Sequence, residues 1–344
     1  MIKNALRSST SSWRWLRWLL GLAILLGLIW HWSRLAEEFD WNSFAQQLKQ
    51  PANLWRFAAV LLLMPINWLL ETRKFQLFVR LFHDWSFWQC WRAVIVGIGA
   101  SSFTPNRIGE IGGRAVLAKK EEVPGILIAT LMSSLAQWLA FLVLAWPGLI
   151  WVGGELLPEA WHAWRWWLLP LGPLLVVLGV GLGLPQVQTL LQRRSNRATS
   201  LADESRLSRF LRPIADRWKW KSADLFQAVS AVKFALIIQT GIYACLRFVV
   251  YCTQIYLLLQ LGGLILPYWY AMAGIAGVYL LQAGIPLPPG INLLLRAELA
   301  SLVFGHSAEA TAASLTAFGL LFVVNVLLPT LPAMWLLVKN EKTR

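Results

Sequence analysis

Charged residues gathered around a proline give the stretch Gly97–Ala115 the strongest potential for chemistry in this chain. The sequence GIGASSFTPNRIGEIGGRA follows an apolar run and carries Pro105, Arg107, Glu110 and Arg114. Pro105 cannot continue a helix, but it can begin a new one whose N-terminus attracts phosphate through unpaired N–H groups. Glu110 and Arg114 are four residues apart and share one face of that helix, with Arg107 one turn earlier. The pattern predicts either a site for a lipid headgroup or an ion network that only holds the break in shape.

A second segment, Gln282–Glu298, repeats this pattern as QAGIPLPPGINLLLRAE. Its prolines force an irregular turn before a short helix that carries Arg296 and Glu298. Arg296 is expected to reach out to the outer interface, and the alternative is a place in the same binding site. Non-helical backbone at membrane depth persists only where protein or a wet cavity satisfies its polar groups. The residues predicted to shape the two breaks are Pro105, Gly109, Gly113, Pro286, Pro288, Pro289 and Gly290.

Arg247 lies well inside the apolar sequence CLRFVVYCTQIYLLLQ. An arginine near the bilayer centre costs on the order of 3 kcal/mol, so it must face a partner or a wet cavity. Tyr251 and Gln254 share its helix face. Its expected partner is an anionic headgroup, or else Glu71 or Glu110. The candidate substrate-binding residues are therefore Asn67, Glu71, Arg107, Glu110, Arg114, Arg247 and Gln254.

Asn67 and Glu71 belong to this set because they are four residues apart in NWLLETRKF. The same sequence is also typical of a simple cytoplasmic stop after a membrane span. No catalytic residue, metal site or cofactor is predicted. The four histidines are scattered through terminal or loop positions, and the GxxGG at 109–113 lacks the lysine and preceding strand of a phosphate-binding loop.

The composition is typical of a polytopic membrane protein. Of the 344 residues, 57% are hydrophobic and 14% charged, and the mean hydropathy is +0.55. A net charge of +14 would suggest nucleic acid in a soluble protein. Here the basic residues cluster in loops beside apolar segments, where they orient the chain and meet anionic headgroups. An anionic membrane lipid, and not nucleic acid, is the expected partner.

We expect an all-α fold of about six full transmembrane helices plus two re-entrant segments. The expected spans are 15–33, 53–70, 125–151, 163–184, 232–261 and 309–337. Lys and Arg counts place both termini, and a basic loop at 185–228, in the cytoplasm of a bacterial-type inner membrane. The sequence 75–91 is expected to lie in an interface.

The same scheme divides the chain into two membrane halves, 1–152 and 153–344. Each half holds three crossings and a broken segment, 92–121 in the first and 272–300 in the second. An odd number of crossings inverts the second half, which is the inverted-repeat arrangement of many secondary transporters. Counting both broken segments as full spans also preserves alternation. That variant is disfavoured because it moves Lys119, Lys120 and the basic loop outside.

With these residues in view, the chain resembles the flippase-like family typified by the membrane region of lysylphosphatidylglycerol synthase. The likeness rests on NWLLETRKF (67–75), TPNRIGEIGGRA (104–115), LRFVVYCTQIYLLLQ (246–260) and PLPPG (286–290), and it covers nearly the whole chain. The resemblance implies a helical bundle that binds or translocates lipid, with Arg247 and Gln254 lining its interior. The chain differs from the family pattern after PPG, where Ile291–Leu295 is apolar and Glu298 comes late. It also ends at Arg344 without a synthase domain, so it is expected not to make aminoacyl lipids.

The leading hypothesis is a lipid flippase, or a transporter of a lipid-linked intermediate, that binds an anionic lipid. One alternative is a membrane enzyme, or an accessory factor, for polyprenyl-phosphate-linked glycan synthesis. Another is an assembly partner whose basic loop, 193–221, docks on anionic lipid or on a biosynthetic enzyme. The expectation for the chain itself is no enzymatic activity.

Overall fold

The computed structural model describes residue 46 and the ranges 49–101, 104, 108–156, 162–198, 232–283, 289–305 and 307–341. Within these residues the secondary structure is helical, as expected for an all-α membrane protein. The chain divides into two compact units, Met1–Asn53 and Leu54–Arg344. The site described below belongs to the second unit.

Five long helical stretches are apolar enough to cross a membrane. They are α3 (Pro51–Val79), α6 (Val123–Leu156), α7 (His162–Ala198), α10 (Phe234–Leu261), and the run of α13 (Ala308–Phe322), the π-helix η3 (Val323–Leu327) and α14 (Thr330–Glu341). Each corresponds to an expected span. The remaining expected span, 15–33, lies outside the described residues.

Two helices continue beyond the expected spans. Helix α3 continues through Glu71 and Lys74 to Val79, and Phe75 within it is fully buried in the fold. The interfacial position expected for 75–91 stays a prediction. The charged residues do not end the helix because both charges find partners inside the fold. Helix α7 continues to Ala198, so the first part of the predicted loop 185–228 is helical. Its Gln, Leu and Arg residues are good helix formers even where they are too polar to span.

Both broken segments are helical hairpins. The first consists of α4 (Phe87–Ser101) and α5 (Ile108–Ala115), and the second of α11 (Tyr268–Gln282) and α12 (Pro289–Phe304). In the second hairpin the Tyr270 hydroxyl donates to the Val303 carbonyl at 3.2 Å, and Arg296 Nε donates to Gln282 Oε1 at 2.7 Å. These pairs show that the two helices run antiparallel, so the chain returns toward the side from which it came. This is the geometry of a re-entrant segment, and entry from opposite membrane faces stays a prediction.

Glycines allow α4 and α5 to pack at backbone distance. A Cβ added to Gly113 would lie 2.8 Å from Ala100 Cβ and 2.9 Å from Gly97 Cα. A Cβ on Gly97 would lie 2.7 Å from Arg114 Cγ, and one on Gly109 would overlap the Ala100 carbonyl oxygen. Small residues at this spacing are the expected means of close helix contact.

The glycines nevertheless do not form the breaks themselves. Gly109 and Gly113 lie within α5, and α12 already begins at Pro289, with Gly290 in its first turn. A proline suits the first helical position because its missing N–H would have no partner there. Pro105, Pro286 and Pro288 lie outside the described residues.

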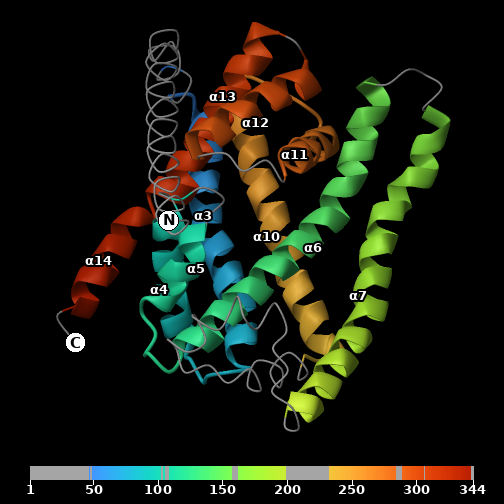
Figure 1. Cartoon of the computed structure of the whole chain (residues 1–344). Helices are drawn as coiled ribbons and strands as arrows, with labels where there is room; N and C mark the ends of the chain where they lie inside the picture. The colour runs from blue at the N-terminus through green and yellow to red at the C-terminus, as the bar shows by residue number, and fades with distance from the viewer. Residues whose placement is uncertain are drawn as a thin grey trace, which may run out of the picture. The chain divides into compact units, whose positions relative to one another are not determined.

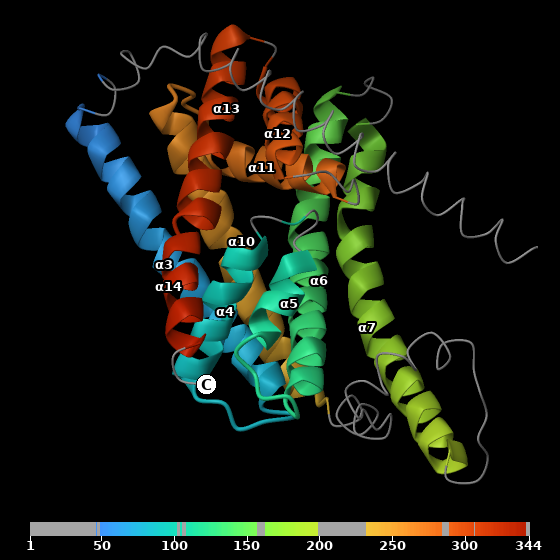
Figure 2. The same cartoon turned by 60° about the vertical axis from the view of Figure 1, so that its left-hand side comes forward.

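Each hairpin packs into its own apolar core. Figures 1 and 2 place α4 and α5 in the lower half of the view and α11 and α12 in the upper half. The lower core includes Phe75 of α3, Val94 of α4 and Ile126 of α6. The upper core includes Ile255 of α10 and Ile275 of α11. Helices α6 and α10 contribute to both halves and connect them.

Candidate functional site

The carboxylate of Glu71 on α3 is the centre of a buried ion cluster. Its Oε2 lies 2.7 Å from Lys74 Nζ and 2.8 Å from Arg247 Nη1, and its Oε1 lies 2.6 Å from Arg114 Nη2. Ser133 Oγ on α6 donates to Oε1 at 3.3 Å. Glu71 is only 3% exposed. One carboxylate therefore joins cations from α3, α5 and α10.

Arg114 anchors the first hairpin to this cluster. Its side chain is 1% exposed and forms ion pairs with Glu71 and with Glu110 one turn earlier. Its guanidinium also lies 4.6 Å from the centre of the Phe75 ring, a favourable cation–π distance. Glu110 and Arg114, four residues apart, thus share a helix face as predicted and form an ion pair. Glu71 of α3 is the second partner of Arg114.

Arg247 enters the same cluster from α10. Besides Glu71, it donates from Nε to Asn67 Oδ1 at 2.7 Å and from Nη1 to Gln137 Oε1 at 3.2 Å. Gln137 Oε1 also accepts from Lys74 Nζ at 2.9 Å, while its Nε2 donates to the Ala244 carbonyl at 3.1 Å. These contacts meet the requirement that an arginine at membrane depth has partners. The structure thus brings together Asn67, Glu71, Glu110, Arg114 and Arg247.

A cavity of about 640 Å³ opens beside this cluster. Both hairpins line it, with Ser101, Thr104 and Glu110 from the first and Gln282, Leu293 and Arg296 from the second. The rest of the wall is mainly aromatic and aliphatic and comes from α6, α10, α13 and η3. The volume falls within the range of about 300–1,000 Å³ typical of ligand pockets. The cavity therefore combines charged groups with an apolar wall.

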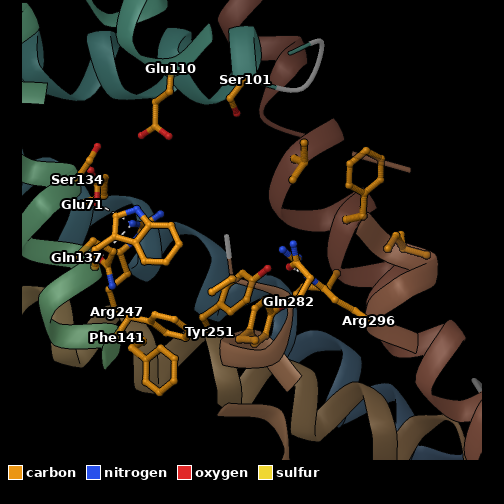
Figure 3. A pocket seen from close by; sticks show the side chains of 18 of the residues that line it. Glu71, Ser101, Glu110, Ser134, Gln137, Phe141, Arg247, Tyr251, Gln282 and Arg296 are labelled. Atoms are coloured by element: carbon orange, nitrogen blue, oxygen red, sulfur yellow. Dashed lines mark hydrogen bonds and ion pairs between the residues drawn. The ribbon is translucent and has the colours of Figure 1, made fainter. Parts of the chain in front are cut away.

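The charges of the cavity are divided between two ends (Figure 3). Arg247 and Gln137 lie beside Glu71, whereas Arg296 and Gln282 lie apart from them, with Tyr251 between the two groups in this view. Arg296 stands 4.6 Å from the centre of the Tyr279 ring, and the rings of Tyr279 and Tyr251 are 5.4 Å apart in an edge-to-face arrangement. Arg296 was interpreted from sequence as an interfacial side chain, but it lines the cavity.

Gln254 does not reach the cavity, contrary to the interpretation that it lines the same surface as Arg247. It is fully buried and exchanges hydrogen bonds with Asn325 of η3, one of them at 2.8 Å from Asn325 Nδ2. Its Nε2 also donates to the Val60 carbonyl of α3 at 2.9 Å. Residues seven apart share only an approximate helix face, and here a buried amide partner holds Gln254 away from Arg247.

Sequence reasoning missed Lys74, Ser133, Gln137 and Gln282 as parts of the site. Lys74 carried a usable signal, because it follows Glu71 by three residues and such neighbours can pair on a helix. The others lie in apolar helices with no distinguishing spacing. Arg107 lies outside the described residues, and its predicted role stays a prediction. Among the residues that are described, no group of three or more His, Cys, Asp or Glu is arranged to hold a metal ion.

The family model for the lysylphosphatidylglycerol synthase TM region matches residues 18–333, which is nearly the whole chain. No curated protein and no solved structure matches the chain.

Proposed function

Because the chain belongs to the family of the lysylphosphatidylglycerol synthase TM region, a multi-pass membrane family of lipid metabolism or transport, we propose that it is a lipid flippase or lipid transporter. Its substrate is an anionic phospholipid or a lipid-linked intermediate. The headgroup binds in the cavity between the two hairpins, and the acyl chains stay in the bilayer. The membrane is the cytoplasmic membrane of a bacterial-type cell, with both chain termini in the cytoplasm.

The observation that carries this proposal is the charge of a cavity that both hairpins share. Lys74, Arg247 and Arg296 line it, and the carboxylates on its wall are Glu71 and Glu110. Arg114 pairs with both carboxylates from behind. The cavity and the residues behind its wall thus hold four cations against two carboxylates, and this excess favours an anionic ligand. Placing such a site between two broken helices is the usual arrangement in secondary transporters.

The wall on α6 supports a route for acyl chains. Leu131 and Trp138 line the cavity and are 53% and 50% exposed. They lie seven residues apart and so share one helix face, with Leu135, also exposed, beside them. A cavity with charged groups inside and an apolar margin outside suits a ligand that is charged at one end only.

Lipid movement in reconstituted vesicles tests the proposal. With fluorescently labelled phosphatidylglycerol in proteoliposomes, the wild type is expected to move label between leaflets. Arg247→Ala is expected to slow this movement about tenfold or more, because it removes a charged hydrogen-bond donor worth about 1.5–3 kcal/mol. Glu110→Ala is expected to slow it as well.

Arg73→Ala is the matched control, since Arg73 is an exposed arginine on α3 outside the cavity. Monodisperse elution of each variant verifies folding. Lipid movement that is equal in wild type, Arg247→Ala and Glu110→Ala would contradict the site. Product formed from a polyprenyl-phosphate-linked donor, without lipid movement, would instead support the enzyme or accessory alternative.

A further inference from the structure

Among the described residues, Arg296 has only neutral partners, unlike the other cations of the cavity. Lys74 and Arg247 share the carboxylate of Glu71, and Arg114 pairs with Glu71 and Glu110. Arg296 contacts the amide oxygen of Gln282 at 2.7 Å and the ring of Tyr279 at 4.6 Å. In the described part of the chain, no carboxylate lies within ion-pair distance of Arg296. The positive charge at this end of the cavity is therefore not balanced by any carboxylate of the described residues.

The carboxylates of the cavity are correspondingly occupied. Glu71 faces three cations and Glu110 pairs with Arg114. The sequences that link each pair of hairpin helices, 102–107 and 284–288, contain no Asp or Glu. A cationic group on a ligand would thus have no available carboxylate among the described lining residues. Tyr279, which could accept a cation on its ring, already holds Arg296.

We propose that Arg296 is the phosphate-binding residue of the cavity and that it selects lipids whose headgroup bears no positive charge. Gln282 and Tyr279 hold the guanidinium with its remaining N–H groups available to a phosphate. A phosphate ester with an uncharged headgroup supplies the missing anion. A zwitterionic or lysyl-modified headgroup adds a cation that must remain unpaired in a site of low polarity. This inference rests on the proposed function and specifies its ligand class.

Lipid binding to the purified full chain in detergent tests the assignment. The probes are short-chain phosphatidylglycerol, phosphatidylcholine and lysyl-phosphatidylglycerol, together with undecaprenyl phosphate. Binding is measured as the rise in unfolding temperature with lipid concentration. The wild type is expected to bind phosphatidylglycerol or undecaprenyl phosphate more tightly than the two lipids that carry a cation, and comparing the two anionic probes identifies the lipid source. Arg296→Gln is expected to weaken anionic lipid binding about tenfold or more, whereas Arg296→Lys retains the preference.

A second pair of variants keeps the arginine and changes only its surroundings. Gln282→Glu places a carboxylate beside Arg296 and is expected to remove the preference for anionic lipid. Gln137→Glu adds the same charge at the Glu71 end and is expected to have the smaller effect. This pair remains informative if Arg296→Gln fails to fold.

The outcomes separate the two proposals. Unchanged anionic binding in Arg296→Gln and Gln282→Glu, with a loss in Arg247→Gln, would overturn the role of Arg296 and leave the proposed function standing. Tighter binding of lysyl-phosphatidylglycerol than of phosphatidylglycerol would overturn the assigned headgroup class. A wild type that binds none of the four lipids would overturn both the inference and the proposed function.

Discussion

At the level of single side chains, Glu71 brings Lys74, Arg114 and Arg247 together through its two carboxylate oxygens. Buried ion pairs cost much desolvation free energy and stabilise a fold only when every charge has good partners. Glu71 is such a partner for cations on three helices, α3, α5 and α10. It is therefore the structural centre of the cluster.

The substitution Glu71→Gln is expected to lower the free energy of unfolding by about 3–5 kcal/mol, because it removes the anion that the buried cations share. Thermal unfolding of the purified variant in detergent measures this loss. Glu121→Gln is the control, since Glu121 is an exposed glutamate at the start of the turn before α6. A Glu71→Gln variant as stable as this control would contradict the shared-anion description.

At the level of elements, the hairpin of α4 and α5 depends on residues without a Cβ. Helix α5 is only eight residues long, too short to be stable alone, so its stability comes from packing and from Arg114. Gly97 lets the Arg114 side chain pass α4, and Gly113 lets the two backbones meet. The position of Glu110 at the cavity follows from this close contact.

Gly113→Ala is expected to destabilise the protein by about 1–3 kcal/mol, because the new methyl group would overlap Ala100 and Gly97. The neighbouring Gly112→Ala is the matched control. A Cβ at Gly112 meets nothing within 4 Å, so this change is expected to be neutral or to stabilise by up to about 1 kcal/mol through helix propensity. Thermal unfolding of the two variants compares them directly, and equal effects would contradict the packing argument.

At the level of the whole second unit, two hairpins in opposite halves of the view enclose one cavity. Such an arrangement suits the proposed transport, because secondary transporters usually bind their substrate between two broken helices. The positive-inside rule predicts, from charge alone, that the two hairpins enter from opposite membrane faces.

Cysteine labelling tests this topology. In a background with Cys90, Cys245 and Cys252 replaced, cysteines are introduced at exposed positions flanking each hairpin. Asp84→Cys and Lys119→Cys flank the first hairpin, and Ile265→Cys and Glu309→Cys flank the second. A membrane-impermeant thiol reagent added to intact cells is expected to label only the second pair, and the first pair is labelled after the membrane is opened. Labelling of all four positions in intact cells, or of one member of each pair, would contradict the inverted hairpins.

Much of this fold could be predicted from sequence, because the length and apolarity of a membrane span are properties of the segment itself and do not depend on tertiary contacts. The five described spans were expected, and so were two helical breaks. What the expected spans did not include is the continuation of helices through polar residues, as after Glu71 in α3. A charged residue that is buried with a partner and one that is exposed at a helix end look the same in the sequence. Only the fold distinguishes them.

The sequence by itself determined that the chain crosses a membrane repeatedly, that the segments 92–121 and 272–300 are broken by prolines, and that Arg247 requires a partner. Those properties follow from local polarity and from the geometry of proline. Tertiary structure decided which residues meet: Glu71 is shared among three cations, Gln254 turns to Asn325, and Arg296 lacks a carboxylate among the described residues. The physical reason is that ion pairs and hydrogen bonds depend on the distances between helices that are far apart in sequence. The spacing of residues along a single helix does not determine these distances.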